Sequence, residues 1–176
     1  CACLVGSEMC IRDRYTLDPK ETGGSLFDKL SGLGGPLLLQ ALEQAEQGTL
    51  SPVPQEHEKH TYAKMLSKAL GEIDFTKDAI VIERLIRGLN PWPSAYTFLN
   101  GKTLKVWKCA VERAECGKEA PGTIIGVDKS GIHVACGSDT LILKEVQLEG
   151  KKRMETDAFL RGYQVTAGTM LKDHKE

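Results

Sequence analysis

The sequence predicts an α+β protein in which a short helical N-terminal segment and a linker precede a small antiparallel β-barrel. Three observations support this fold class: helical spacing of apolar residues in the first third, a polar stretch with two prolines over 49–61, and strand-like alternation from Ala95 onward. The chain has 176 residues, of which 41% are hydrophobic and 27% are charged. This length and composition are typical of one folded domain with an appendage, and they exclude wholesale disorder.

The first third of the chain predicts two short helices. Apolar residues recur at helical spacing over 25–33, and a second apolar run extends over 37–47. Gly34 and Gly35 separate the two runs, and Pro36 is placed where a new helix would begin. We therefore expect the helix to be interrupted at this pair of glycines.

A third helix is predicted from Thr76 or Asp78 to Leu89. Ile82 and Ile86 lie four residues apart and therefore on one face of that helix. The segment 90–93 (NPWP) follows as a rigid elbow, because each proline fixes its own φ angle.

From Ala95 the pattern changes to that of β-strands. Asn100 and Gly101 predict a tight hairpin turn between two of them, because both residues readily adopt positive φ angles. The expected strands span 96–99, 102–111, 123–127, 132–136 and 140–148, and a short helix spans 154–160. We expect residues 165–171 to complete the barrel or to cover it.

Residues 1–14 show neither helical nor strand periodicity, and they do not begin with Met. They also lack the cationic and long apolar regions of a secretory signal. We interpret this segment as non-native read-through and exclude it from the predicted fold.

Neither the cysteines nor the histidines form a recognisable metal site. The six cysteines fit no CxxC spacing, which predicts reduced thiols with no structural zinc and no required disulfide. His57 and His60 are one residue too close for the zincin motif, and we expect them in a solvated linker. His133 alternates with apolar neighbours in a predicted strand, and we expect its side chain to point away from the core.

The net charge of −1 excludes a uniformly basic nucleic-acid coat, but cationic side chains are concentrated locally. Residues 57–113 carry 10 basic and 6 acidic side chains, whereas 15–56 carry 2 basic and 6 acidic. Lys77, Arg84 and Arg87 are spaced to form a cationic stripe on the third helix. Spacing by itself favours a solvated helix face over a binding surface.

The sequence contains no recognised catalytic motif. GxSxG, Walker A and HExxH patterns are all absent. The glycine-rich stretch 32–35 follows a predicted helix rather than a strand, which is not the context of a phosphate-binding loop. The residues by themselves therefore indicate a helical segment joined to a small barrel, a type of barrel that often binds oligonucleotides.

Several short stretches together carry a resemblance to one known family. They are Glu21–Leu30 (ETGGSLFDKL), Thr61–Lys64 (TYAK), Ile73–Phe75 (IDF), Ile86–Thr97 (IRGLNPWPSAYT), Pro121–Ile124 (PGTI), Lys152–Met154 (KRM) and Phe159–Leu160. By the order and spacing of these stretches, the chain resembles the methionyl-tRNA formyltransferase family over 15–171. Phe75 stands where the family usually has Trp, which is a conservative departure.

The resemblance implies a domain organisation. Residues 15–48 correspond to the last helices of the family's catalytic domain, 49–94 to a linker with one helix, and 95–176 to an OB-like C-terminal domain. In the family, an N-terminal folate-binding domain carries an Asn, a His and an Asp that perform formyl transfer. No residue of this chain matches those three, so the resemblance implies a fragment that has no catalytic residues and is inactive by itself.

The resemblance also implies substrates and partners. The full-length parent transfers a formyl group from 10-formyltetrahydrofolate to the amino group of initiator methionyl-tRNA in the cytoplasm. This chain is expected to bind no cofactor and to be a monomer. No membrane contact is expected, since the longest apolar run, Cys1–Val5, is far below the roughly 20 residues of a membrane span. The expected tRNA contacts, directed at phosphates, are Lys64, Lys77, Arg84, Arg87, Lys151, Lys152 and Arg153.

Two other interpretations stay open from the sequence. The chain could be an autonomous OB-type nucleic-acid-binding or assembly module, or the C-terminal part of a related formyltransferase that acts on a sugar nucleotide. Upstream coding sequence for a folate-binding domain would support the formyltransferase fragment over the autonomous module. Binding to tRNA compared with a UDP-sugar would separate the sugar-nucleotide case.

Overall fold

A computed structural model describes residues 15–51, 58, 61–113 and 119–171. The chain divides into two compact units: the first comprises Cys1–Pro19 and Ser25–Met65, and the second comprises Lys20–Gly24 and Leu66–Glu176. The expected read-through segment, the pair His57 and His60, and four of the six cysteines lie outside the described residues. Among the described residues, no helix combines the length and the apolar character needed to cross a membrane.

The main element of the first unit is α1 (Gly23–Glu46), a single continuous helix with Pro36 inside it. The predicted interruption at Gly34 and Gly35 is therefore wrong. No atom outside the helix lies within 4 Å of where a Cβ would stand on either glycine, so no packing contact holds a turn there. The backbone there stays helical instead of forming a turn. It does so although, relative to alanine, glycine destabilises a helix by about 1 kcal/mol and proline by about 3 kcal/mol.

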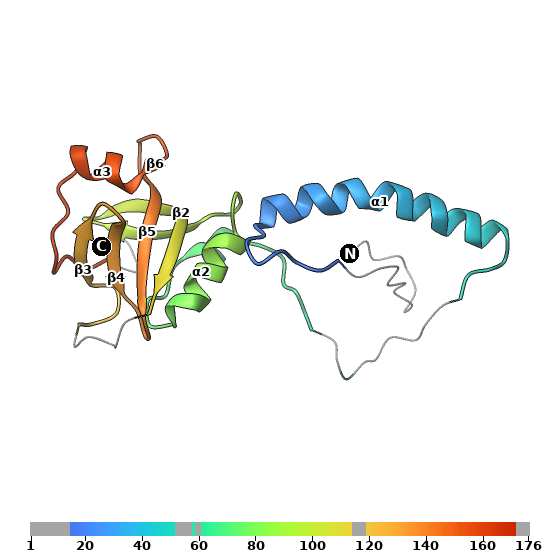
Figure 1. Cartoon of the computed structure of the whole chain (residues 1–176), viewed down its shortest axis with the longest axis horizontal. Helices are drawn as coiled ribbons and strands as arrows, with labels where there is room; N and C mark the ends of the chain where they lie inside the picture. The colour runs from blue at the N-terminus through green and yellow to red at the C-terminus, as the bar shows by residue number, and fades with distance from the viewer. Residues whose placement is uncertain (1–14, 52–57, 59–60, 114–118, 172–176) are drawn as a thin grey trace. The chain divides into compact units, whose positions relative to one another are not determined.

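The second unit is built on an antiparallel sheet with the strand order β1-β2-β5-β4-β3, and β6 pairs with β5 (Figure 1). The strands are β1 (Ala95–Leu99), β2 (Lys102–Glu112), β3 (Ile124–Asp128), β4 (Gly131–Ala135), β5 (Thr140–Leu148) and β6 (Met154–Glu155). Asn100 and Gly101 join β1 to β2 with φ angles of 50° and 73°. The predicted tight hairpin turn is therefore confirmed.

Two helices and a 3₁₀ turn accompany the sheet. The short η2 (Lys68–Gly71) precedes α2 (Ala79–Gly88), which buries Ala79, Ile82 and Ile86 as the apolar spacing predicts. The last helix, α3 (Thr156–Gly162), begins two residues later than predicted, because Met154 and Glu155 pair with β5. The core of this unit is mainly apolar. Its completely buried residues include Ile73, Leu104, Ile132, Leu141, Leu143 and Val146.

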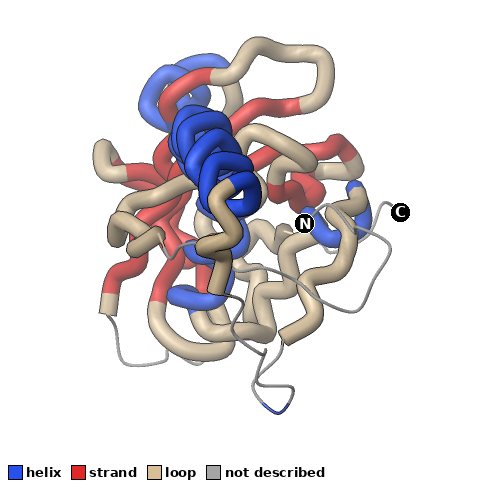
Figure 2. Tube along the Cα trace, turned by 90° about the vertical axis from the view of Figure 1, so that its right-hand side faces the viewer, coloured by secondary structure: helices blue, strands red, loops and turns tan. Residues whose placement is uncertain are grey.

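The sheet is open rather than closed into a barrel, although the α+β class is confirmed. Residues 163–171 form a loop, drawn in tan in Figure 2, instead of a closing strand. This loop covers the edge of β3, where Ile124 N donates to Thr169 O at 2.8 Å and Gly168 N donates to Ile124 O at 2.8 Å. Of the two predicted roles of residues 165–171, completing the barrel is wrong, and the segment instead lies along the edge of β3.

We predict that Gly137→Ala destabilises the second unit. A Cβ at Gly137 would stand 2.0 Å from the carbonyl oxygen of Thr76, so the backbone ahead of α2 would have to move away from the sheet. We expect the free energy of unfolding to fall by about 1–3 kcal/mol in a urea titration. Gly88→Ala is the matched control, since a Cβ there meets nothing within 4 Å and should leave stability unchanged or slightly higher. Equal stability of the two variants would contradict this packing.

Candidate nucleic-acid interface

Three of the predicted cationic residues lie on or next to α2. Arg84 is exposed and makes no hydrogen bond or ion pair with another described residue. Lys77 is also exposed and lies 3.8 Å from a carboxylate oxygen of Asp74. Arg87 differs from both, because its Nε donates to Glu83 Oε1 at 2.9 Å and its Nη1 donates to the carbonyl oxygen of Glu21 at 2.7 Å. Arg87 therefore holds residues of the chain together, while Arg84 is available to a ligand.

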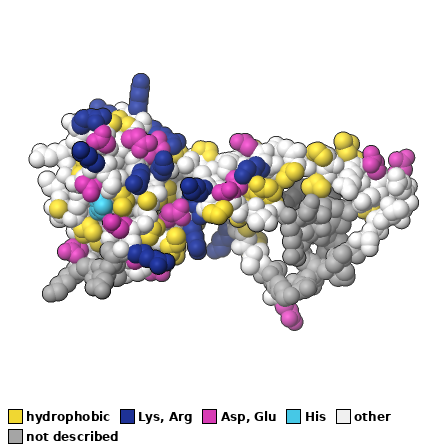
Figure 3. Space-filling view, in the orientation of Figure 1, with side chains coloured by type: hydrophobic (Ala, Val, Ile, Leu, Met, Phe, Trp, Pro, Cys, Tyr) yellow, Lys and Arg dark blue, Asp and Glu magenta, His cyan; other side chains and the backbone are white. Residues whose placement is uncertain are grey.

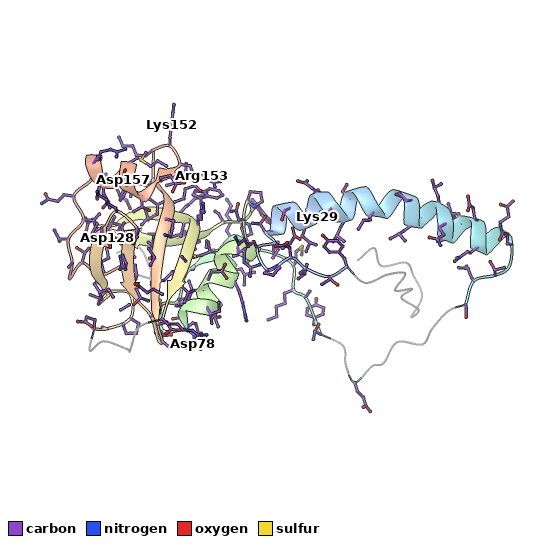
Figure 4. The ribbon with its side chains drawn as sticks, viewed as in Figure 1. Lys29, Asp78, Asp128, Lys152, Arg153 and Asp157 are labelled. Carbon is purple, nitrogen blue, oxygen red and sulfur yellow. The ribbon has the colours of Figure 1, made fainter. Side chains whose placement is uncertain are left out.

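Three further predicted residues, Lys151, Lys152 and Arg153, lie in the turn between β5 and β6. Lys151 and Lys152 are exposed, and neither side chain pairs with another described residue. Figure 4 shows Lys152 projecting from one end of the second unit, while Asp78, the neighbour of Lys77, lies at the opposite end. Lys151–Arg153 therefore lie together in one turn, at the end of the second unit opposite to Asp78. Lys64, the remaining predicted contact, belongs to the first unit and is exposed.

Arg153 is bound to the outer face of the sheet. Its Nε and Nη2 donate to the two carboxylate oxygens of Glu145 at 2.5 and 2.7 Å, and its guanidinium carbon lies 4.7 Å from the ring centre of Trp107. A forked pair of this kind is stronger than a single hydrogen bond, and the stacking adds about 0.5–1 kcal/mol at an exposed site. The hydrogen bonds from Arg153 lower the pKa of Glu145, and the same bonds raise the pKa of Arg153.

Sequence reasoning missed the strand residues that surround this stack. Lys105 and Trp107 alternate with the buried Leu104 and Val106 on β2, so both side chains lie on the outer face. Lys105 Nζ lies 5.9 Å from the ring centre of Trp107. The alternation of polar and buried residues was visible in the sequence, but the pairing of β2 with β5 was not.

Cationic and acidic side chains are mixed over this unit (Figure 3). Glu145 already neutralises Arg153, whereas Lys105, Lys151 and Lys152 have no ion pair with a described residue. These ammonium groups can bind phosphates as point charges. Acid–base or nucleophilic chemistry would need different groups from these.

A second polar cluster surrounds His133 at the β3–β4 hairpin. Asp128 Oδ1 lies 3.2 Å from His133 Nε2, Ser130 Oγ lies 2.9 Å from the same nitrogen, and Glu112 Oε2 lies 3.3 Å from Nδ1. The side chain of His133 leaves the core as predicted, but it is only 15% exposed because these partners cover it. The hydroxyl of Ser130 also donates to Asp128 at 2.6 Å, so these bonds close the hairpin on itself.

The two described cysteines, Cys109 and Cys136, are free thiols. Burial raises the pKa of each to about 12, so neither is a thiolate nucleophile at neutral pH. Within the described part of the chain, no group of three or more His, Cys, Asp or Glu side chains could hold a metal ion.

The comparisons with known proteins agree with this fold. Residues 65–164 match the family described as Formyl transferase, C-terminal domain. This match covers more than half of the chain, and the protein therefore belongs to the formyl transferase C-terminal domain family.

Two curated relatives of high identity are methionyl-tRNA formyltransferases. The chain is 50% identical over 172 residues to the methionyl-tRNA formyltransferase of Lachnospira eligens, covering 96% of this chain and 55% of that protein. It is 51% identical over 162 residues to the methionyl-tRNA formyltransferase of Agathobacter rectalis, covering 92% of this chain and 52% of that protein. The chain thus spans about half the length of these curated relatives.

Among solved structures, a variant of HypX from Aquifex aeolicus matches with a TM-score of 0.50 at 19% identity. The match covers 74% of this chain and 24% of the HypX chain. It shows a shared fold.

We predict that Asp128→Asn lowers stability in a pH-dependent way. Hydrogen bonds from Ser130 and His133 lower the pKa of Asp128 below its ordinary value of 3.8, so the folded state favours the carboxylate. This contribution to stability is present above pH 3.8 and is lost as the pH falls through the lower folded-state pKa. The melting temperature of the variant should lie below that of the unsubstituted chain at pH 7, and the gap should narrow below pH 3.8. Asp157→Asn controls for losing a surface carboxylate, and a gap that widens in acid would refute the assignment.

Proposed function

We propose that this chain is the tRNA-binding part of a methionyl-tRNA formyltransferase. The observation that carries this proposal is 50% identity to a methionyl-tRNA formyltransferase over 96% of the chain. The family match over residues 65–164 and the exposed lysines of the β5–β6 turn support it. In this proposal the second unit holds initiator methionyl-tRNA by its phosphate backbone, so that contacts give affinity and orientation rather than sequence reading.

The full-length parent then transfers a formyl group from 10-formyltetrahydrofolate to the amino group of the methionyl-tRNA. We propose that residues 15–48 end its catalytic domain, 49–94 form its linker and 95–176 form its C-terminal domain. The folate substrate binds outside this chain, which carries no catalytic residue of its own. The protein works in the cytoplasm, and this part of it is a monomer.

We rank the proposed contacts by the intramolecular partners of their side chains. Arg84, Lys151 and Lys152 bind phosphates directly, because no described carboxylate competes for them. Arg87 and Arg153 contribute less to affinity, since a phosphate would have to displace Glu83 or Glu145 from a hydrogen-bonded pair. Lys77 is intermediate, because its 3.8 Å pair with Asp74 is exposed and worth at most about 1 kcal/mol.

We predict that the purified chain does not formylate methionyl-tRNA. None of its four histidines lies in a motif that matches the catalytic residues of the family, and general acid–base catalysis requires such groups beside the reacting amine. Incubation with methionyl-tRNA and 10-formyltetrahydrofolate should give no product above background, with a full-length methionyl-tRNA formyltransferase as the positive control. Formylation that scales with the concentration of this chain would refute the assignment.

We predict that Arg84→Glu weakens binding of initiator tRNA about tenfold in a filter-binding titration. The change removes one phosphate contact, so the slope of log affinity against log salt should become less steep by about one. About four contacts in the unsubstituted chain should give a slope near −3, at roughly 0.7–0.9 per contact.

Arg161→Glu is the matched control for this variant. Arg161 is exposed on α3, pairs with Asp157 and is not among the proposed contacts, yet the substitution changes the net charge equally. Equal effects of the two substitutions would show a general charge effect and remove Arg84 from the interface. Binding of a UDP-sugar in preference to tRNA would favour the sugar-nucleotide alternative.

A further inference from the structure

The turn between β5 and β6 is fixed by backbone hydrogen bonds to β5 and to β2. Lys151 N donates to Leu148 O at 2.9 Å, which closes the turn, and Glu149 N donates to Thr103 O at 2.8 Å. The φ angle of Gly150 is 75°, a value that a β-turn of type II requires at its third residue and that glycine adopts without strain. The backbone that carries the two lysines is therefore a built turn with a defined shape.

The side chain of Gln147 joins this turn to Trp107. Trp107 Nε1 donates to Gln147 Oε1 at 3.2 Å, and Gln147 Nε2 donates to the carbonyl oxygen of Lys151 at 3.0 Å. The side-chain amide of Gln147 thus accepts a hydrogen bond from β2 and donates one to the turn. This arrangement fixes the backbone at Lys151 relative to the sheet.

Arg153 fixes the other side of Lys152. Its guanidinium is bound by both oxygens of Glu145 and lies over the ring of Trp107. Trp107 therefore contacts the groups that hold the chain before and after Lys152. Figure 4 shows Lys152 extending away from the protein.

We propose that Trp107, Gln147 and Arg153 are positioning residues that hold Lys151 and Lys152 toward the phosphates of an RNA backbone. This inference rests on the proposed RNA-binding function and assigns Arg153 a different role from that of a phosphate contact. A fixed turn loses less conformational entropy on binding than a loose one, so its lysines bind more tightly with the same charge. The ligand chemistry is two neighbouring phosphodiesters, recognised by two ammonium groups without base reading.

A double-mutant cycle on the full 176-residue chain tests the proposal. Its four proteins are the unsubstituted chain, Gln147→Met, the pair Lys151→Ala with Lys152→Ala, and the combination of all three substitutions. Met has a similar length to Gln but can neither accept from Trp107 nor donate to the Lys151 carbonyl. Affinity for initiator tRNA and its salt dependence are measured by filter binding, and folding is monitored by thermal unfolding.

The expected results differ between the backgrounds. Gln147→Met should weaken tRNA binding about three- to tenfold when the lysines are present and should have no effect when they are absent. Removal of both lysines should make the salt slope less steep by about 1.5, from roughly 0.7–0.9 per contact. Gln164→Met, at an exposed loop position away from the turn, is the matched control and should leave affinity unchanged.

Each contrary result has a distinct meaning. An equal effect of Gln147→Met in both backgrounds would overturn the positioning role. Unchanged tRNA affinity after removal of both lysines would overturn this inference while leaving the proposed function intact. Absence of tRNA binding by the unsubstituted chain would overturn both.

A second variant covers the case in which Gln147→Met fails to fold. Trp107→Phe keeps an aromatic ring under Arg153 and removes the Nε1–H that donates to Gln147. It should show the same dependence on the lysines, and independence from them would equally overturn the proposal.

Discussion

The antiparallel pairing of β2 with β5 is the constraint on which both the core and the candidate interface depend. On one face of this pair, Leu104, Val106 and Val146 enter the core; on the other face lie Trp107 and Gln147. A slip of one residue would exchange the two faces, because side chains alternate with a period of two. The register shifts between Val106 and Lys108, and the extra residue at this bulge is Trp107. One register therefore sets the packing of the core and the position of the exposed stack.

Elements decided by local chemistry were predictable from the sequence. The helix α2 follows from the four-residue spacing of Ile82 and Ile86, and the β1–β2 hairpin follows from the Asn-Gly pair at 100–101. Elements decided by distant contacts were not. The helix α1 continues through Pro36 without a contact at Gly34 or Gly35. Residues 163–171 bind the edge of β3 through hydrogen bonds to residues about 45 positions earlier, which local patterns do not specify.

The sequence predicted which segments of the candidate interface are cationic, but not which groups of the chain bind those cations. Arg87 and Arg153 lie in basic stretches that the sequence shows plainly. The carbonyl oxygen that accepts from Arg87 belongs to Glu21, 66 residues away, and the amide bonded to Trp107 is 40 residues away. Such partners follow from the strand register and from chain packing, which composition and periodicity leave undetermined. Counts of local charge consequently cannot distinguish cations that are paired within the chain, such as Arg153, from unpaired ones, such as Lys152.

The difference between arginine and lysine explains how a chain with a net charge of −1 could bind the anionic partner that we propose. The planar guanidinium binds a carboxylate through two parallel hydrogen bonds, and this geometry makes Arg153 an effective structural group. The ammonium of Lys152 is a compact and hydrated charge that needs no partner to remain at the surface. Screening at physiological salt reduces interactions beyond about 8 Å, so distant carboxylates oppose a phosphate at Lys152 only weakly. The unpaired cations of the turn, rather than the net charge of the chain, therefore determine the attraction in the proposed complex.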